Sequence, residues 1–389
     1  MPHYPARLRL TGATILRDGA LQRRSVAVED GRISKGPLPE VDLTGFYILP
    51  GIVDLHGCAL TRQLAGPPAA RPRLAEALRI CDGIAARNGI TTGWLAHDWS
   101  WEGGIHAPEH CDAFLRALEA YRTIAMTDLQ AQILCEVNTV DSQDYLLATV
   151  RRHAVGSVLF RNELESARQM AEAGLAALSH HAHGSGRSID AHLAALERAE
   201  ARRRDVPRHL CRLSEAFDAL GVVYGSRGDS DGETREYYTQ IGAKVCALPQ
   251  RRAAAALARA VGDPILLSAS EVTGSKPGQT PDLLRAGLGD ALVSGEEPGA
   301  LVQAAFRLAS EGIMDLPKAW EAVSARPAAL ARLTDRGIID YDRRADLVIV
   351  HAGRRSVEAT LVGGRLVWVT GEAAERFAPA RATSGLAAE

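Results

Sequence analysis

Short apolar runs alternate with amphipathic helical patterns through the middle of the chain. Each run has the length of a buried strand, and helical patterns over 73–87, 253–260 and 299–309 lie between runs. Eight such units in roughly 250 residues are what a (β/α)8 TIM-like barrel needs. The stretch 163–218 is too long for one unit and predicts an additional helical excursion. The strand candidates are 47–56, 90–97, 129–137, 155–160, 221–226, 243–248, 264–269 and 291–294.

Both ends of the chain are rich in short strands rather than in helical patterns. Two pairs of alternating segments are joined by residues that favour tight hairpins, Asp30-Gly31 near the start and Gly363-Gly364 near the end. The two ends therefore predict one small composite β-sandwich domain. We expect it to comprise residues 1–48 and 335–372, around a barrel of residues 49–334, with a mobile tail over 373–389.

Composition favours an ordinary globular protein. Of the 389 residues, 46% are hydrophobic and 24% are charged, and the net charge of −2 gives no reason to expect nucleic acid or a membrane surface as partner. The six cysteines are scattered, which is typical of reduced thiols. No signal-peptide pattern or long apolar run is present, so we predict a cytoplasmic protein that acts on a small molecule. Whether it forms a homo-oligomer stays open.

The most informative stretch is residues 49–57, LPGIVDLHG, in which a strand pattern carries a carboxylate and an imidazole two positions apart. Side chains at i and i+2 of a strand share one face, so Asp54 and His56 would be presented together at a barrel mouth. Glu136 ends another predicted strand. These three residues are the predicted ligands of a divalent metal, with Zn²⁺ the first candidate, which would activate water. The alternative is that they are only polar residues at the barrel mouth.

Three further stretches complete a recognisable set: 134–137 (LCEV), 274–278 (GSKPG), and 291–294 (ALVS) followed by 301–306 (LVQAAF). Together with LPGIVDLHG between two strand-rich ends, they resemble the amidohydrolase superfamily and, within it, the phosphonate-metabolism branch. The resemblance spans nearly the whole chain. It implies a metal-dependent hydrolase that acts on a phosphorylated or C–N-bonded small molecule.

The chain departs from that branch where the branch has metal ligands and a catalytic acid. Where the branch has a Glu-x-His-x-Asp pattern, this chain has Asp54-Leu55-His56-Gly57-Cys58. Where the branch has Ser-His-Asp-Asp, this chain has SRGD over 226–229. The position of the branch's final-strand aspartate is occupied by Gly295. The segment 159–163 (LFRNE) stands where the branch has Asp-His-Thr-Pro-Gly. Two ligand histidines and the catalytic aspartate are thus replaced, and Asp229 is the remaining candidate for a catalytic base.

Arg227 supports a second hypothesis, because a guanidinium cannot bind a cation. It is able to take the electrostatic place of a metal, or to hold a phosphate through two hydrogen bonds. Ser275 and Lys276 lie on a glycine-flanked loop and complete a predicted cationic pocket. The alternative to the hydrolase is therefore a catalytically inactive relative that binds a phosphorylated ligand or a partner protein. Whether the chain is an enzyme stays open.

Two histidine-containing segments have no settled role. His97 and Asp98 end a predicted strand, where they either take part in acid–base chemistry or form a satisfied polar pair. The cluster His180, His181 and His183 follows a helical pattern, and we expect it to lie on an exposed loop.

Overall fold

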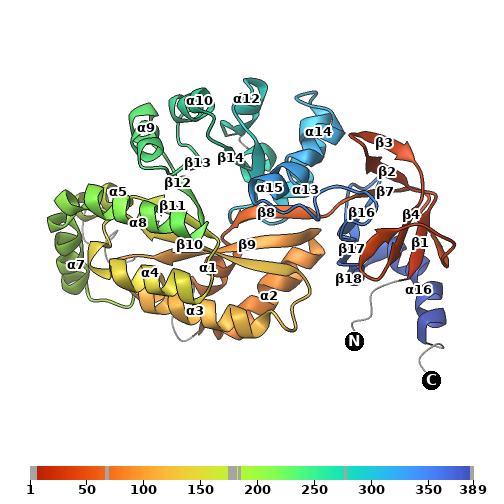
Figure 1. Cartoon of the computed structure of the whole chain (residues 1–389), viewed down its shortest axis with the longest axis horizontal. Coiled ribbons are helices and arrows are strands. Elements are labelled where there is room, and N and C mark those ends of the chain that lie inside the picture. Colours follow the sequence, from red (N-terminus) through yellow and green to blue (C-terminus); the bar gives the residue numbers. More distant parts are fainter. Residues whose placement is uncertain (1–6, 66–69, 174–181, 183–184, 276–277, 386–389) are drawn as a thin grey trace.

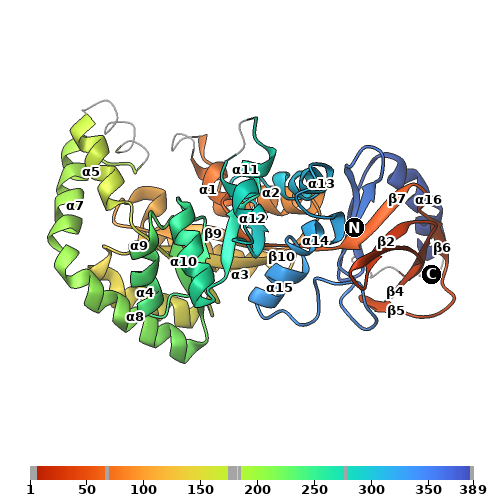
Figure 2. The ribbon, with the colours of Figure 1, turned by 90° about the horizontal axis from the view of Figure 1, so that it is seen from above.

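The chain folds into a barrel with two smaller sheets together at one end, as a computed structural model shows (Figures 1 and 2). The structure describes all residues except 1–6, 66–69, 174–181, 183–184, 276–277 and 386–389, and for 173 and 379–385 it describes the backbone only.

The barrel is one sheet of eight parallel strands in sequential order, so the predicted (β/α)8 fold is confirmed. Its closure comes from a parallel bridge between Gly57 and Gly295, where the Gly295 N–H donates to the His56 carbonyl over 3.0 Å. The strands are β8 (Ile52–Gly57), β9 (Ile90–Trp99), β10 (Asp128–Glu136), β11 (Ser157–Arg161), β12 (Val223–Arg227), β13 (Val245–Ala247), β14 (Ile265–Ser268) and β15 (Ala291–Val293).

Helices cover the outside of the barrel. The long predicted excursion over 163–218 is confirmed, since it holds α5, α7 and α8, and α5 and α7 lie at the end of the molecule opposite the terminal sheets (Figures 1 and 2). The α-helices are α1 (Ala59–Leu64), α2 (Leu74–Arg87), α3 (Pro108–Tyr121), α4 (Gln143–Arg152), α5 (Leu164–Ala173), α7 (Ile189–Ala201), α8 (Val206–Leu220), α9 (Gly232–Gln240), α10 (Arg252–Val261), α11 (Ser270–Thr273), α12 (Thr280–Arg285), α13 (Ala300–Ser310), α14 (Leu316–Glu321), α15 (Ala325–Leu330) and α16 (Gly371–Gly385). Short 3₁₀ turns are η2 (Gly104–His106), η3 (Val140–Ser142) and η4 (Arg203–Asp205).

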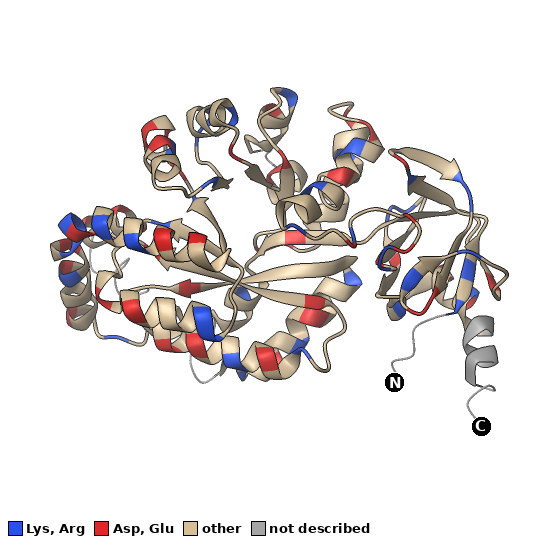
Figure 3. Cartoon of the chain, viewed as in Figure 1, with Lys and Arg blue, Asp and Glu red and all other residues tan. Residues whose placement is uncertain are grey.

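Alternating side chains along each barrel strand divide the core into an inner and an outer part. The inner cluster includes Leu55, Leu134, Leu159 and Leu266, whereas residues one position along, such as Phe160, pack outward against the helices. This alternation decides which polar side chains of β10, β11 and β12 point into the barrel. In β8, where the pairing with β9 shifts register between Asp54 and Gly57, Leu55 and His56 both face inward. Charged residues of both signs are mixed over the surface helices, and the barrel strands carry few of them (Figure 3).

The two ends of the chain build two sheets around a shared core. One has the order β5-β4-β1-β6 and the other β18-β17-β16-β7-β2-β3, and residues such as Leu10, Ile48 and Leu361 from both sheets form one buried cluster. The strands are β1 (Leu8–Thr11), β2 (Thr14–Arg17), β3 (Ala20–Arg23), β4 (Val26–Glu29), β5 (Arg32–Ser34), β6 (Glu40–Asp42), β7 (Phe46–Pro50), β16 (Leu347–His351), β17 (Val357–Val362) and β18 (Arg365–Val369).

Both predicted hairpins of these sheets are confirmed. Asp30 and Gly31 join β4 to β5, and Gly363 and Gly364 join β17 to β18, with φ positive at all four residues. Such left-handed conformations favour the Asp-Gly and Gly-Gly pairs found here. The segment predicted to be a mobile tail contains α16, whose Phe377 is buried in the core of the terminal sheets.

The first predicted strand, 47–56, is wrong in one respect, because it is two strands. It divides at Gly51 into β7, which belongs to the terminal sheet, and β8, which begins the barrel. A Cβ atom at Gly51 would lie 2.3 Å from the Thr91 hydroxyl oxygen, so the change of sheet depends on glycine at this position.

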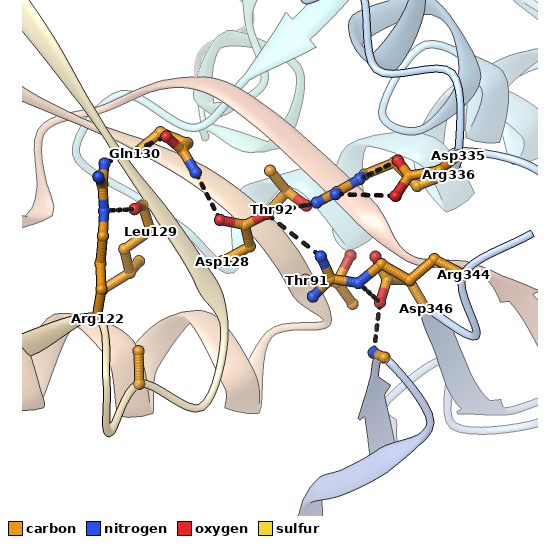
Figure 4. Close-up of polar contacts among 12 residues, drawn as sticks. Thr91, Thr92, Arg122, Asp128, Leu129, Gln130, Asp335, Arg336, Arg344 and Asp346 are labelled. Carbon is orange, nitrogen blue, oxygen red and sulfur yellow. Dashed lines mark hydrogen bonds and ion pairs between the residues drawn. The ribbon is translucent and has the colours of Figure 1, made fainter. Parts of the chain in front are cut away.

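An ion-pair network joins the amino-terminal end of the barrel to the segment that leads into β16 (Figure 4). Asp128, at the start of β10, accepts from Arg336 over 2.6 Å and from Arg344 over 3.3 Å. Arg344 also donates to Asp346, which in turn accepts from the Gly363 N–H over 2.7 Å. Burial alone would raise the pKa of Asp128, but the hydrogen bond and charge of Arg336 outweigh it, so the pKa is lowered. Asp128 therefore links the barrel to the terminal sheets.

We expect Asp128→Asn to lower the free energy of unfolding by about 2–3 kcal/mol at pH 7, because two partly buried guanidiniums lose a shared partner. Since the pKa of Asp128 is lowered on folding, its contribution is present above the unfolded value of about 3.9 and is lost as the pH falls through the folded value. Urea denaturation at pH 7 and pH 3 measures this. Glu236→Gln, on the exposed face of α9, is the control. An equal loss at both pH values would contradict the prediction.

Candidate functional site

His56 lies at the centre of the candidate site, fully buried at the end of β8. Its Nδ1 is 2.6 Å from the Gln132 Oε1, and its Nε2 is 3.3 Å from the Arg227 Nε. The Gln132 amide group donates to the Leu55 carbonyl and to the Ser157 hydroxyl, so its oxygen faces His56. Nδ1 must therefore carry the proton, and Nε2 accepts the Arg227 N–H.

The ring of His56 is held neutral by its surroundings. Burial and then the charge of Arg227 lower the pKa of His56 to about 4. Cys58, two residues along, has its Sγ 3.6 Å from the His56 Nε2. Burial raises the pKa of Cys58 to about 11, so this residue is a thiol at neutral pH.

Asp54 is buried on the same strand, but its carboxylate faces other neighbours. One oxygen accepts from the Ser294 N–H over 3.1 Å, and the other accepts from the Ser294 hydroxyl over 2.5 Å. The first also accepts from the His56 backbone N–H over 3.3 Å. Burial raises the pKa of Asp54, and it outweighs the hydrogen bonds from Ser294 and His56, which lower that pKa. Both oxygens are thus engaged at the junction of β8 with β15, which closes the barrel.

Glu136, at the end of β10, is fully buried and belongs to a cluster organised by Arg161. The Glu136 oxygens accept from the Asn138 amide over 3.2 Å and from the Glu163 N–H over 3.0 Å, and the Arg161 Nε is 3.8 Å away. Burial outweighs the charge of Arg161 and raises the pKa of Glu136 to about 8. Glu136 is therefore mostly protonated at neutral pH.

Arg161 spans three acidic side chains from its position at the end of β11. It lies 3.1 Å from an oxygen of Asp98 and 3.0 Å from one of Glu102, besides its contact with Glu136. His106 contacts the other oxygen of Asp98 over 2.5 Å. Burial alone would raise the pKa of Asp98, but the His106 hydrogen bond and Arg161 outweigh it, so the pKa is far below its ordinary value.

The side chains of His97 and Asp98 point to opposite faces of the barrel sheet. Asp98 points into the barrel toward Arg161, whereas His97 packs outward against α3, where its ring stacks on Phe114 at 5.0 Å. The His97 Nε2 is 3.0 Å from the His110 Nδ1, and burial lowers its pKa to about 4. His97 is a packed core residue.

The structure does not bring Asp229 to the cluster around His56. Asp229 follows β12 on the outer side of the barrel, where one oxygen accepts from the Ser226 hydroxyl over 2.8 Å and from the fully buried Arg235 over 3.3 Å. The same oxygen lies 3.6 Å from the outward-facing Cys246 Sγ. The residue predicted as a catalytic base therefore lies buried beside Arg235, away from the predicted metal ligands, because the chain turns outward at Gly228.

The loop expected to complete a cationic pocket is described only in part. Ser275 is exposed between α11 and α12 and makes neither a hydrogen bond nor an ion pair with Arg227 in the described part of the chain. Lys276 lies outside the described residues, as do His180, His181 and His183. Arg227 itself has a 29% exposed side chain, and its nearest carboxylate is Glu163 at 4.0 Å.

Sequence reasoning missed Gln132 and Arg161, the two residues that organise the site. The polar positions 128, 130 and 132 alternate with apolar ones and indicate a polar inner face of β10. Arg161 stands in the segment 159–163 that departs from the branch pattern. Glu102 and His106 lie in a loop and a 3₁₀ turn, for which no sequence pattern gives a direction.

No protein-family model matches the chain. Among curated proteins it is similar to alpha-D-ribose 1-methylphosphonate 5-triphosphate diphosphatase of Escherichia coli (strain K12). The two are 27% identical over 351 residues, which cover 84% of this chain and 90% of that protein. The resemblance to the amidohydrolase superfamily is confirmed.

Solved structures show the same fold at low identity. An amidohydrolase matches with a TM-score of 0.64 and 11% identity, over 94% of this chain and 100% of that one. A beta-aspartyl dipeptidase from Fervidobacterium islandicum AW-1 matches with a TM-score of 0.61 and 14% identity, over 93% and 96%. The N-acetylglucosamine-6-phosphate deacetylase from Pasteurella multocida matches with a TM-score of 0.61 and 12% identity, over 92% of this chain and 99% of that one.

The superfamily implies a divalent metal, and the side chains of this site do not fit one. Among the residues that the structure describes, no three His, Cys, Asp or Glu side chains converge to hold an ion. The His56 Nε2 lone pair, which a metal would need, accepts the Arg227 N–H, and the Arg227 charge would repel a cation there. Asp54 and Glu136 are engaged by N–H and O–H donors. The predicted ligands are therefore present, but they are satisfied by protein groups.

Replacing Arg161 should destabilise the fold. We expect Arg161→Met to lower the free energy of unfolding by about 3–5 kcal/mol, because Asp98 and Glu102 would lose the guanidinium that they share in the interior. Chemical denaturation measures the loss. Arg168→Met, on the surface of α5, is the matched control and should cost less than about 1 kcal/mol. Similar losses for the two variants would contradict the role assigned to Arg161.

Replacing Arg227 should change the titration of His56. We expect Arg227→Gln to raise the pKa of His56 from about 4, because the guanidinium charge that opposes protonation is removed, while burial keeps it below 6.5. Nitrogen-15 NMR of the histidine rings across pH 3–8 reports both the pKa and the tautomer. An unchanged pKa would show that Arg227 does not contact His56 in solution.

Proposed function

We propose that this chain is a metal-free relative of the amidohydrolase superfamily that binds a small phosphorylated molecule at the carboxyl ends of its barrel strands. One observation carries the proposal: the Arg227 Nε donates to the His56 Nε2, where a catalytic metal would otherwise bind. A positive charge is thus kept at the barrel mouth without an ion.

The free donors of Arg227 support an anionic ligand. Its Nε is used by His56, while its two terminal nitrogens have only Glu163, at 4.0 Å, as a charged partner in the described structure. The side chain is also 29% exposed. A planar guanidinium with its outer N–H groups free matches a phosphate through two parallel hydrogen bonds.

The relative from Escherichia coli supports the choice of phosphate over other anions. Its name describes a phosphorylated sugar phosphonate as substrate, and we extend the phosphorylated class to this chain. The proposal assigns Arg227 to the phosphate and leaves Ser275 and Lys276 as further candidate contacts. It assigns His56 a positioning role, since this residue holds Arg227 through its neutral ring.

Calorimetric titration with inorganic diphosphate, triphosphate and ribose 5-phosphate tests the phosphate site. We expect saturable binding of at least one of these probes, weakened roughly tenfold to a hundredfold in Arg227→Gln, because a charge-assisted hydrogen bond is lost. Arg252→Gln, on the exposed start of α10, removes the same charge elsewhere and should leave binding unchanged. Unchanged binding in Arg227→Gln would overturn the phosphate site.

Metal content tests the metal-free part of the proposal separately. Plasma mass spectrometry of protein purified without chelator or histidine tag should find well below one equivalent of zinc, manganese or iron per chain. Reconstitution followed by desalting should not raise that value. A stoichiometric metal that is lost in Glu136→Gln would overturn the proposal and favour the superfamily's metal-dependent hydrolysis.

A further inference from the structure

A cavity of about 610 Å³ opens at the amino-terminal end of the barrel, opposite the site described above. The first residues of β11, β12 and β13 and the middle of β10 (130–132) line it, together with the loops that precede these strands. Its volume falls in the range of small-molecule pockets, about 300–1,000 Å³. The proposed function involves only the floor of this cavity, Gln132, which contacts His56.

The deep part of the cavity is apolar. Leu55, Leu159 and Leu266 of the inner barrel core form its walls, and Trp94 and Val245 join them. Gln132 forms its polar floor, but both its N–H groups and its oxygen are engaged, by Leu55, Ser157 and His56. Since the floor needs no further partner, an apolar group placed there leaves no donor or acceptor unsatisfied.

The rim of the cavity is cationic. Arg122, Lys244 and Arg332 line it, whereas Asp218 is the one carboxylate among the described lining residues. Lys244 and Arg332 are exposed and make no ion pair within the described ranges. Asp218 accepts the Tyr224 hydroxyl over 3.0 Å. The positive charges therefore exceed the negative ones by two, beside an apolar interior.

We propose that this cavity binds a small amphiphilic carboxylate, with an aliphatic or aryl chain inside the barrel and the carboxylate at the rim beside Lys244 and Arg332. The apolar walls favour burial of the chain, and the unpaired cations favour an anionic head over a neutral or positive one. The cavity and the phosphate site lie at opposite ends of the barrel, and they share Gln132, which forms the floor of the cavity and contacts His56.

The test compares decanoate with decanol, which has the same chain and no charge. Calorimetry on the whole protein should show saturable one-to-one binding of decanoate, and decanol should bind at least fivefold more weakly. The double variant Lys244→Gln with Arg332→Gln should weaken decanoate roughly fivefold and leave decanol unchanged. The double variant Lys318→Gln with Arg252→Gln removes the same charge at two exposed residues that do not line the cavity, and it is the control.

A filling variant tests the location. Ala331 lines the cavity and is partly exposed after α15, so Ala331→Trp should block it without replacing a core residue, which circular dichroism checks. We expect Ala331→Trp to abolish decanoate binding while diphosphate binding at Arg227 stays unchanged. Unaltered decanoate binding in this variant would overturn the cavity as the site. Equal binding of decanoate and decanol, or no saturable binding of either, would overturn the proposed ligand class.

Discussion

An imidazole lone pair can accept one hydrogen bond or bind one cation. The chemistry of the candidate site depends on which of these two partners the His56 Nε2 has. Gln132 fixes the proton on the opposite nitrogen, so Nε2 is available as an acceptor. Arg227 uses it. The guanidinium brings its own charge, and this charge makes the site unfavourable for a divalent ion even though the imidazole remains in place.

A second arginine, Arg161, also places a positive charge in the candidate site. Arg161 stands at the end of the strand beside Glu136, and its guanidinium neutralises Asp98 and Glu102 in the interior. Acidic side chains that would repel one another without a cation are thus kept in a buried cluster. Two arginines at the ends of β11 and β12 therefore place permanent positive charge at this end of the barrel.

Much of the fold could be predicted from the sequence, because periodicity and turn residues are local properties. The eight barrel strands, the hairpins at Asp30-Gly31 and Gly363-Gly364 and the helical excursion were all visible in this way. Less of the candidate site could be predicted from the sequence. Strand position indicated that His56 and Glu136 lie at strand ends, where the structure has them, but the sequence cannot show that Arg227 reaches His56 across the barrel. Asp229 shows the same limit, because the turn at Gly228 decides which side of the barrel it occupies.

Gly51 gives the molecule a mechanical property. Strand β7 is paired on both sides within the terminal sheet, and β8 continues from it after a single residue into the barrel. The peptide that carries Asp54 and His56 is thus anchored at one end in the terminal sandwich and at the other where the barrel closes on Gly295. A rotation of the terminal sheets relative to the barrel would displace β8, the strand that holds His56. The position of His56 within the barrel is therefore coupled, through β8, to the packing of the terminal sheets.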